Sequence, residues 1–276
     1  SKIIDNLKFK LTIDQISSLK NINKDMESKQ KMFRLLQGDV GSGKTIVSVI
    51  AALNAVKAGY QVAIKTPTEI LAIQHYKFIL KNFNKYCNLE ILTGKTDYKK
   101  RKKILNDLLN NKINILIGTH SLFQEKITYF NLGLIIIDEQ HKFGVNQRKK
   151  LSDKGGKDCD VLVMSATPIP RTMMMTIYGD MDISLIKSKP KNRKPIKTYS
   201  KNETKINEVI NFIKSEISKK NQVFWVCPLI KESKKIDYQS AIEKYKYLNK
   251  IFKDRVDIVH GAMRKEEKDK VLNKFN

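Results

Sequence analysis

The stretch Gly38-Asp39-Val40-Gly41-Ser42-Gly43-Lys44-Thr45 fits the phosphate-binding pattern G-x-x-x-x-G-K-[ST] at each defined position. It lies between a short apolar run, Arg34–Gln37, and a longer one, Ile46–Ala58, which Gly59 ends. These flanks predict a strand before the loop and a buried helix after it. The glycines let successive N–H groups point inward, and the helix N-terminus adds positive partial charge. The stretch therefore predicts a nucleoside triphosphate site in which Lys44 reaches the outer phosphates and Thr45 holds Mg²⁺.

A second motif follows farther along the chain, where the apolar run Leu134–Ile137 ends in Asp138-Glu139-Gln140-His141. Ligands of open parallel sheets bind at the carboxyl ends of the strands. We expect Asp138 to hold Mg²⁺ through water and Glu139 to orient or deprotonate the water that attacks the terminal phosphate. The alternative is a solvated acidic loop after a strand. The upstream phosphate loop argues against this alternative.

A third motif, Ser165-Ala166-Thr167, ends the apolar run Val161–Met164. Small hydroxyl groups beside an acidic motif can bond to it and report whether the terminal phosphate is present. The alternative is an ordinary turn, since Pro168 and Pro170 follow at once.

The order of the segments predicts an α/β protein. Apolar runs alternate with helical patterns, which is typical of a parallel sheet covered on both faces. With 276 residues, 41% of them hydrophobic, the chain can form one large or two ordinary domains. Strands are predicted at 34–37, 61–66, 89–93, 113–118, 132–137 and 161–165, and helices near 12–25, 44–58, 69–86 and 97–111.

The basic, proline-containing stretch 187–195 predicts a linker, after which a second α/β unit begins. In that unit we expect strands at 196–199, 222–227 and 257–260, and helices near 203–219, 239–253 and 264–275. So short a unit predicts the front half of a domain, and the chain is expected to be a fragment.

The formal net charge of +25 favours a polyanionic partner, of which nucleic acid is the natural one, although a genome-wide composition bias explains part of it. No apolar run is long enough for a membrane span, and the N-terminus has no signal-peptide pattern. We therefore expect a cytoplasmic protein that does not bind membranes. The three cysteines, at 87, 159 and 227, are too far apart for a metal or redox motif, and we expect reduced thiols.

The three motifs, in this order and spacing, resemble the superfamily 2 helicases. Longer strings resemble the RecG family of branched-DNA translocases, and the resemblance spans nearly the whole chain. These strings are Arg34–Thr45, Pro67–Ala72 with Gln74-His75, Ile117–His120, Asp138–Val145, Ala166–Thr172, Tyr178–Asp182, Val226–Ile230 and His260-Gly261.

The resemblance implies a RecA-like P-loop NTPase lobe at 1–186, a linker at 187–195 and the N-terminal part of a second RecA-like lobe at 196–276. It also implies an ATP-dependent, Mg²⁺-requiring monomeric helicase that acts on stalled replication forks and Holliday junctions in DNA recombination and repair. In this family a wedge domain precedes the motor and arginine fingers follow in the second lobe. We expect both to lie outside this chain, which should therefore bind ATP and Mg²⁺ but hydrolyse ATP weakly.

Site roles come with the resemblance. Lys44, Glu139 and His141 are expected to act in catalysis, and coupling to DNA is expected to involve Gln140, His141, Ser165, Ala166 and Thr167. Backbone N–H and hydroxyl groups of Pro67-Thr68-Glu69 and Gly118-Thr119-His120 are expected to hold DNA phosphates. For Thr68 an N-cap is the alternative.

Gln15 has two compatible interpretations. In related helicases a glutamine at this place reads the adenine edge, whereas Thr12-x-x-Gln15 is also a capping box.

Two other functions stay open. One is a transcription-repair coupling translocase or an RNA helicase of the same superfamily. The other is a nucleotide-switched nucleic-acid-binding module without efficient hydrolysis.

Overall fold

The computed structural model describes residues 4, 7, 9–119, 122, 127–138, 159–167, 181–188, 196–227 and 234–275. The chain divides into two compact units, Ser1–Lys194 and Pro195–Asn276. The division falls at the end of the predicted linker, 187–195.

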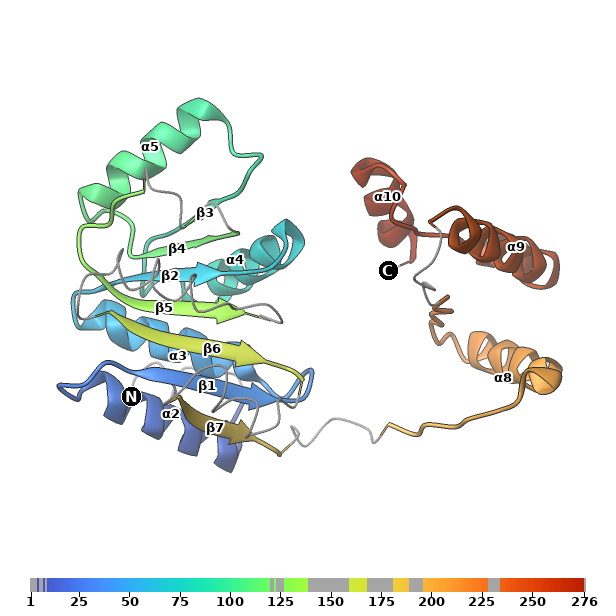
Figure 1. The fold of residues 1–276 in the computed structure, drawn as a ribbon, viewed down its shortest axis with the longest axis horizontal. Coiled ribbons are helices and arrows are strands. Elements are labelled where there is room, and N and C mark those ends of the chain that lie inside the picture. The colour runs from blue at the N-terminus through green and yellow to red at the C-terminus, as the bar shows by residue number, and fades with distance from the viewer. Residues whose placement is uncertain are drawn as a thin grey trace. The chain divides into compact units, whose positions relative to one another are not determined.

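Within the described residues, the first unit contains a seven-stranded sheet in the order β3-β4-β2-β5-β6-β1-β7 (Figure 1). All neighbouring strands run parallel, so their carboxyl ends meet at one edge. The strands are β1 (Phe33–Gly38), β2 (Gln61–Lys65), β3 (Leu89–Leu92), β4 (Ile115–Gly118), β5 (Leu132–Asp138), β6 (Asp160–Ser165) and β7 (Asp182–Ile186). The parallel α/β architecture and the six predicted strands are confirmed.

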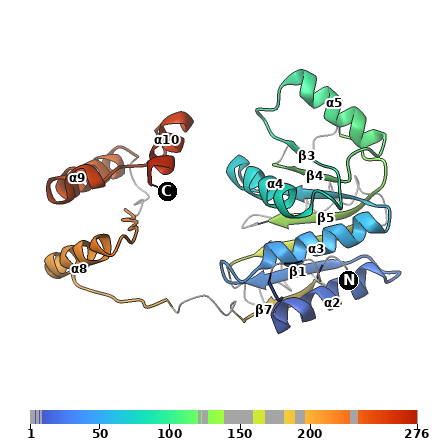
Figure 2. The same cartoon turned by 180° about the vertical axis from the view of Figure 1, so that it is seen from behind.

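Four helices among the described residues of this unit cover the sheet, and all four were predicted: α2 (Ile13–Met26), α3 (Lys44–Lys57), α4 (Glu69–Phe83) and α5 (Tyr98–Leu109). Helices α2, α3 and α4 lie on one face, which Figure 2 shows from the front. Their apolar residues form one core with alternate strand residues such as Leu36 and Ile64. Helix α5 packs on the other face, where Ile104 and Leu108 meet Leu116. Alternate residues of the buried strands thus serve two cores, as a doubly covered sheet requires.

Gln61, the first residue of β2, is fully buried and joins three segments. Its Nε2 donates to the carbonyl oxygens of Leu108 and Ile113, at 2.8 Å each. Its Oε1 accepts from the backbone N–H groups of Phe130 and Asn131, at 2.8 and 3.2 Å. One buried amide therefore satisfies backbone groups at the end of α5, before β4 and before β5.

Strand β7 was not predicted. It lies at the sheet edge beside β1, and its short sequence, Asp-Ile-Ser-Leu-Ile, carries no long apolar run. Arg34 of β1 is buried, donates from Nε to Asp25 of α2 at 2.5 Å, and donates from Nη1 to Ser184 of β7 at 3.0 Å. A buried guanidinium needs such partners, so tertiary contacts stabilise this strand more than its own sequence does.

The second unit contains helices α8 (Ile206–Ser218), α9 (Lys234–Phe252) and α10 (Lys265–Phe275), close to the predicted positions. The predicted strands at 196–199, 222–227 and 257–260 are wrong: none of these described segments is a strand. A strand exists only through hydrogen bonds to a neighbour, and these segments form no ladder with one another. Large apolar side chains such as Phe224 and Val226 are accordingly exposed.

None of the helices in the described parts of the chain combines the length and hydrophobicity that crossing a bilayer requires. All three cysteines are free thiols, as expected. Burial raises the pKa of Cys87 to about 11 and that of Cys159 to about 12, so both remain protonated at neutral pH.

Candidate nucleotide and nucleic-acid site

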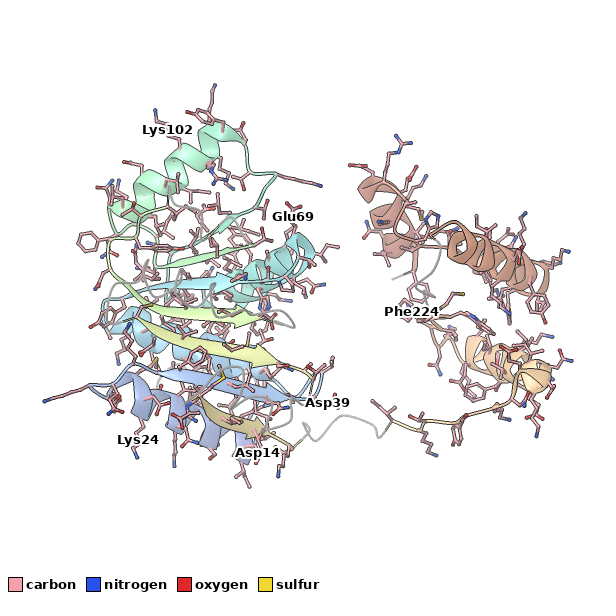
Figure 3. All side chains as sticks on the ribbon, in the orientation of Figure 1. Asp14, Lys24, Asp39, Glu69, Lys102 and Phe224 are labelled. Atoms are coloured by element: carbon pink, nitrogen blue, oxygen red, sulfur yellow. The ribbon has the colours of Figure 1, made fainter. Side chains whose placement is uncertain are left out.

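The phosphate-loop stretch follows β1 at the carboxyl edge of the sheet and enters α3 at Lys44. Gly41 and Gly43 have φ angles of 75° and 89°, a left-handed conformation that favours glycine. A Cβ atom on Gly43 would also lie 2.3 Å from Nε2 of Gln15. Asp39 of the loop and Glu69 at the start of α4 lie at the same edge of the sheet (Figure 3).

Two side chains of the loop have the chemistry to meet phosphate. Lys44 is only 9% exposed, and its Nζ donates to the carbonyl oxygens of Gly38 at 2.7 Å and Asp39 at 3.2 Å. Phosphate oxygens in place of these carbonyls would gain charge-assisted hydrogen bonds. The buried hydroxyl of Ser42 has no hydrogen-bond partner among the described residues, and such a group favours an incoming acceptor. The loop therefore fits a phosphate-bearing ligand.

Gln15 connects the cap of α2 to the phosphate loop. Its Oε1 accepts from Thr12 N at 2.9 Å, while Thr12 Oγ1 accepts from Gln15 N at 3.3 Å, so the predicted capping box is present. Gln15 Nε2 donates to the carbonyl oxygen of Ser42 at 2.8 Å. The side chain is 3% exposed, and both ends of its amide are thus bonded within the protein. Contact with adenine stays a prediction.

Asp138 is the last residue of β5, at the carboxyl edge that also carries the phosphate loop. It pairs in register with Met164 of β6, which in turn pairs with Leu36 of β1. Adjacent strands are about 4.8 Å apart, so the Cα atoms of Asp138 and Leu36 are separated by about 10 Å. The acidic residue and the loop therefore face one site, as the motif order indicated.

His75 of α4 bonds directly to Asp138. The distance from His75 Nε2 to Asp138 Oδ2 is 2.6 Å, and the two side chains are 8% and 11% exposed. An ionised carboxylate only accepts hydrogen bonds, so Nε2 is the donor. Sequence reasoning assigned no role to His75, although its spacing from the buried Ala72 and Ile79 places it on the inward face of the helix.

Thr45 and Asp138 match Mg²⁺ in donor type, since a hydroxyl and a carboxylate both offer oxygen. Among the described residues no three His, Cys, Asp or Glu side chains gather into a metal cage. At nucleotide sites Mg²⁺ uses one or two protein ligands together with phosphate oxygens and water, so two donors suffice. A hydrogen bond such as that from His75 commonly orients a ligating carboxylate. The magnesium assignment therefore stays a prediction that these residues fit.

The Ser165–Thr167 motif folds into a local turn next to the phosphate loop. Ser165 Oγ lies 3.0 Å from Thr167 Oγ1 and accepts from Thr167 N at 3.2 Å. Gln37, the residue before Gly38, donates from Nε2 to the carbonyl oxygen of Thr167 at 3.1 Å. The turn and the loop are thus physically connected, which the predicted coupling role requires.

The two predicted DNA-contact turns lie side by side at the same edge. Thr66 joins them: its N–H donates to the carbonyl oxygen of Gly118 at 2.8 Å, and its hydroxyl donates to that of Thr68 at 2.9 Å. Thr68 accepts from Leu71 N and caps α4, so the capping alternative is confirmed. A Cβ on Gly118 would lie 2.1 Å from the carbonyl oxygen of Leu92, which gives this glycine a packing role. DNA contact by either turn stays a prediction.

Four predicted site residues lie outside the described residues: His120, Glu139, Gln140 and His141.

The sequence also gave no sign of a contact between α2 and the residues that follow β7. Asp14, in the first turn of α2, accepts from the N–H groups of Lys187 and Ser188 at 2.9 and 2.7 Å. These bonds, from Ser188 above all, hold the pKa of the Asp14 carboxyl below its ordinary value. The first residues of the predicted linker are thus fixed to the helix that carries Gln15.

The DEAD/DEAH box helicase model matches residues 12–176, which is more than half of the chain. The chain belongs to the DEAD/DEAH box helicase family. In this chain the matched region runs from the cap of α2 through the phosphate loop, Asp138 and the Ser165–Thr167 turn.

The chain is also similar throughout to RecG proteins. It is 46% identical to "ATP-dependent DNA helicase RecG" of Thermotoga maritima over 99% of this chain, and 45% identical to that of Bacillus subtilis over 100%. The chain spans 35% and 41% of the length of these two relatives.

A solved structure of RecG bound to a three-way DNA junction is 43% identical, with a TM-score of 0.79, over 99% of this chain and 36% of that one. The DEAD-box helicase Mss116, at 18% identity and a TM-score of 0.69, shares the fold over 99% of this chain and 60% of its own. The RecA-like fold and the resemblance to RecG are confirmed.

Proposed function

We propose that this helicase is the motor core of an ATP-dependent translocase that remodels branched DNA. Its substrates are stalled replication forks and Holliday junctions, and its role is in DNA recombination and repair. The observation that carries the proposal is the grouping of the phosphate loop, Asp138 and the Ser165–Thr167 turn at one sheet edge, in a chain similar over its whole length to RecG. The likeness to a RecG structure that holds a three-way junction favours branched DNA.

The chemistry proposed is hydrolysis of the terminal phosphate of ATP, to which bound Mg²⁺ contributes neutralising charge. Lys44 exchanges its bonds to the loop carbonyls for bonds to the outer phosphates. Thr45 and Asp138 hold the ion, and Glu139 orients or deprotonates the attacking water. His141 and Gln140 act with the Ser165–Thr167 turn to connect the phosphates to bound DNA.

DNA phosphates are proposed to bind the two neighbouring turns, Pro67–Glu69 and Gly118–His120. Pro67 and Thr68 are exposed, as a contact with DNA requires. Because these groups meet the backbone rather than base edges, they support movement along DNA without reading its sequence. The surplus of positive charge, +25 over the whole chain, favours the same partner.

The domain limits proposed are 1–186 for the first RecA-like lobe, 187–195 for the linker and 196–276 for the N-terminal part of the second lobe. The protein is proposed to be a cytoplasmic monomer. Transition-state charge on the phosphate commonly requires an arginine finger, which is worth about 10³ to 10⁵ in rate. No motif in these 276 residues resembles one. We therefore expect the isolated chain to bind ATP with Mg²⁺ and to hydrolyse it weakly, and strong DNA-stimulated turnover by this chain would contradict us.

The test is ATP hydrolysis by the protein at its full natural length, at one fixed salt concentration. The nucleic acids compared are single-stranded DNA, linear duplex, a three-way fork and structured RNA. Strong preference for the fork supports the proposal. Equal stimulation by linear duplex indicates a general duplex translocase, such as a transcription-repair coupling factor. Preference for RNA indicates an RNA helicase, and no stimulation indicates a nucleotide-switched binding module.

A further inference from the structure

His75 is a buried polar residue that the proposed chemistry does not use. It lies on α4, seven residues after the capping residue Thr68, while its bonding partner Asp138 lies at the end of β5. Strands β2 and β5 are neighbours, and α4 begins four residues after β2 ends. The side chain of His75 therefore lies beside the carboxyl end of β5, where it bonds to the proposed magnesium residue.

The bond is short and shielded from water. Its length is 2.6 Å, and the side chains of His75 and Asp138 are 8% and 11% exposed. A hydrogen bond to a charged group in such surroundings is stronger than one in water. It occupies Oδ2 of Asp138, and a carboxylate has a second oxygen with which to bind an ion or its water. The geometry is therefore that of a ligand held in one orientation by a neighbour.

We propose that His75 is a positioning residue that fixes the Asp138 carboxylate for the magnesium ion of the nucleotide site. The inference deepens the proposed function and rests on its assignment of Mg²⁺ to Asp138. His75 lies on α4, and α4 begins in the turn Pro67–Glu69, which is proposed to hold DNA phosphates. One hydrogen bond thus links the DNA-contact segment Pro67–Glu69, through α4, to the metal ligand.

The experiment measures nucleotide affinity rather than turnover. A fluorescent ATP analogue is titrated into the 276-residue chain and into the full-length protein, without DNA, once with Mg²⁺ and once with EDTA. The ratio of the two affinities isolates the contribution of the ion. For His75→Ala we expect this ratio to fall about tenfold, the lower end of the effect of removing a partner of a metal ligand. Without the ion, His75 has no ligand to position, so the affinity of His75→Ala in EDTA should stay within about twofold of the wild-type affinity in EDTA.

Two further variants separate positioning from general loosening of the helix. In His75→Gln the side-chain amide nitrogen stands as many bonds from Cβ as Nε2 does in histidine, so it can donate to Asp138 and should restore most of the ratio. Ile79→Val removes one buried methylene group from the same face of α4, one turn later, and should leave the ratio unchanged.

Combining His75→Ala with Asp138→Ala gives a further check. If His75 acts only through Asp138, the double variant should lose no more of the Mg²⁺-dependent ratio than Asp138→Ala alone. The proposal is overturned if His75→Ala keeps the wild-type ratio, if Ile79→Val lowers the ratio equally, or if wild-type affinity does not depend on Mg²⁺. The first two outcomes are separate from failure of the proposed function, which would show as absent fork stimulation while the magnesium ratio still responds to His75. The third outcome would also remove the assignment of Mg²⁺ to Asp138 in the proposed function.

Discussion

Gln15→Ala is expected to weaken both the fold and the nucleotide site, because one side chain serves both. The substitution removes two hydrogen bonds, one from Thr12 N at 2.9 Å and one to the carbonyl oxygen of Ser42 at 2.8 Å. Each is worth about 1 kcal/mol net, so we expect the free energy of unfolding to fall by about 2 kcal/mol. Loss of the bond to Ser42 also releases the phosphate loop. A cost of about 1 kcal/mol in the free energy of nucleotide binding lowers nucleotide affinity about fivefold.

Thr12→Ala is the matched control. It removes the hydroxyl that accepts from Gln15 N and from Ser188 Oγ, at about 1 kcal/mol for the lost N-cap, but leaves the Gln15 bond to the loop. Urea unfolding followed by circular dichroism measures stability, and titration with fluorescent ATP and GTP analogues measures affinity. We expect Gln15→Ala to weaken both nucleotides about fivefold and Thr12→Ala to weaken neither.

Two results would show that Gln15 does not act in this way. If Gln15→Ala weakens ATP but not GTP, the amide reads the adenine base and does not act by shaping the loop. A loss of stability below about 0.5 kcal/mol would mean that the two bonds contribute little.

Three further predictions concern single residues. Lys44→Ala should abolish ATP binding, whereas Glu139→Gln should keep binding and lose turnover. Nucleotide titration measures binding, and phosphate release measures turnover. An equal loss of binding in both variants would contradict this division of roles. Gly43→Ala should lower ATP affinity at least about tenfold, because Gly43 has a φ of 89° and the added Cβ would lie 2.3 Å from the Gln15 side chain. Gly59→Ala is the control: its φ is 91° but nothing lies within 4 Å of the added Cβ, so it should lower only the stability, by about 1 kcal/mol. Burial raises the pKa of Asp160 from 3.8 to about 6, so its ionisation lowers the free energy of unfolding as pH rises between these values. Asp160→Asn should therefore have a higher urea midpoint than wild type at about pH 8, and this difference should shrink at about pH 5. A larger difference at about pH 5 would contradict the burial argument.

The first unit could be predicted from the sequence because its strands are short apolar runs between strong helix signals. The segment 132–137 is one such run, and a continuous run of this length indicates a strand buried on both faces. The motifs also placed the phosphate loop and Asp138 at one edge, since parallel strands end together. Strand β7 escaped prediction because its stability comes from pairing with β1 and from Arg34, which a local pattern does not reveal.

The second unit shows the opposite error. The segment 222–227 is as apolar as a buried strand, yet without a paired neighbour it forms none. In the site, the sequence contained no signal that His75 would meet Asp138, because the contact joins residues 63 positions apart. The bonds from Lys187 and Ser188 to Asp14 likewise depend on how the sheet edge is placed beside α2. Pairwise contacts of this kind are set by tertiary structure.

The proposal that this protein moves branched DNA is tested by ATP-dependent conversion of a labelled synthetic fork, using the full-length protein. Fork and products are separated on a native gel, with Lys44→Ala as the control. We predict that the wild-type protein reverses the fork into a four-way junction only when ATP and Mg²⁺ are present, and that Lys44→Ala leaves the fork intact. A fork that stays unchanged, although the protein binds it and hydrolyses ATP, would mean that the protein does not move branched DNA.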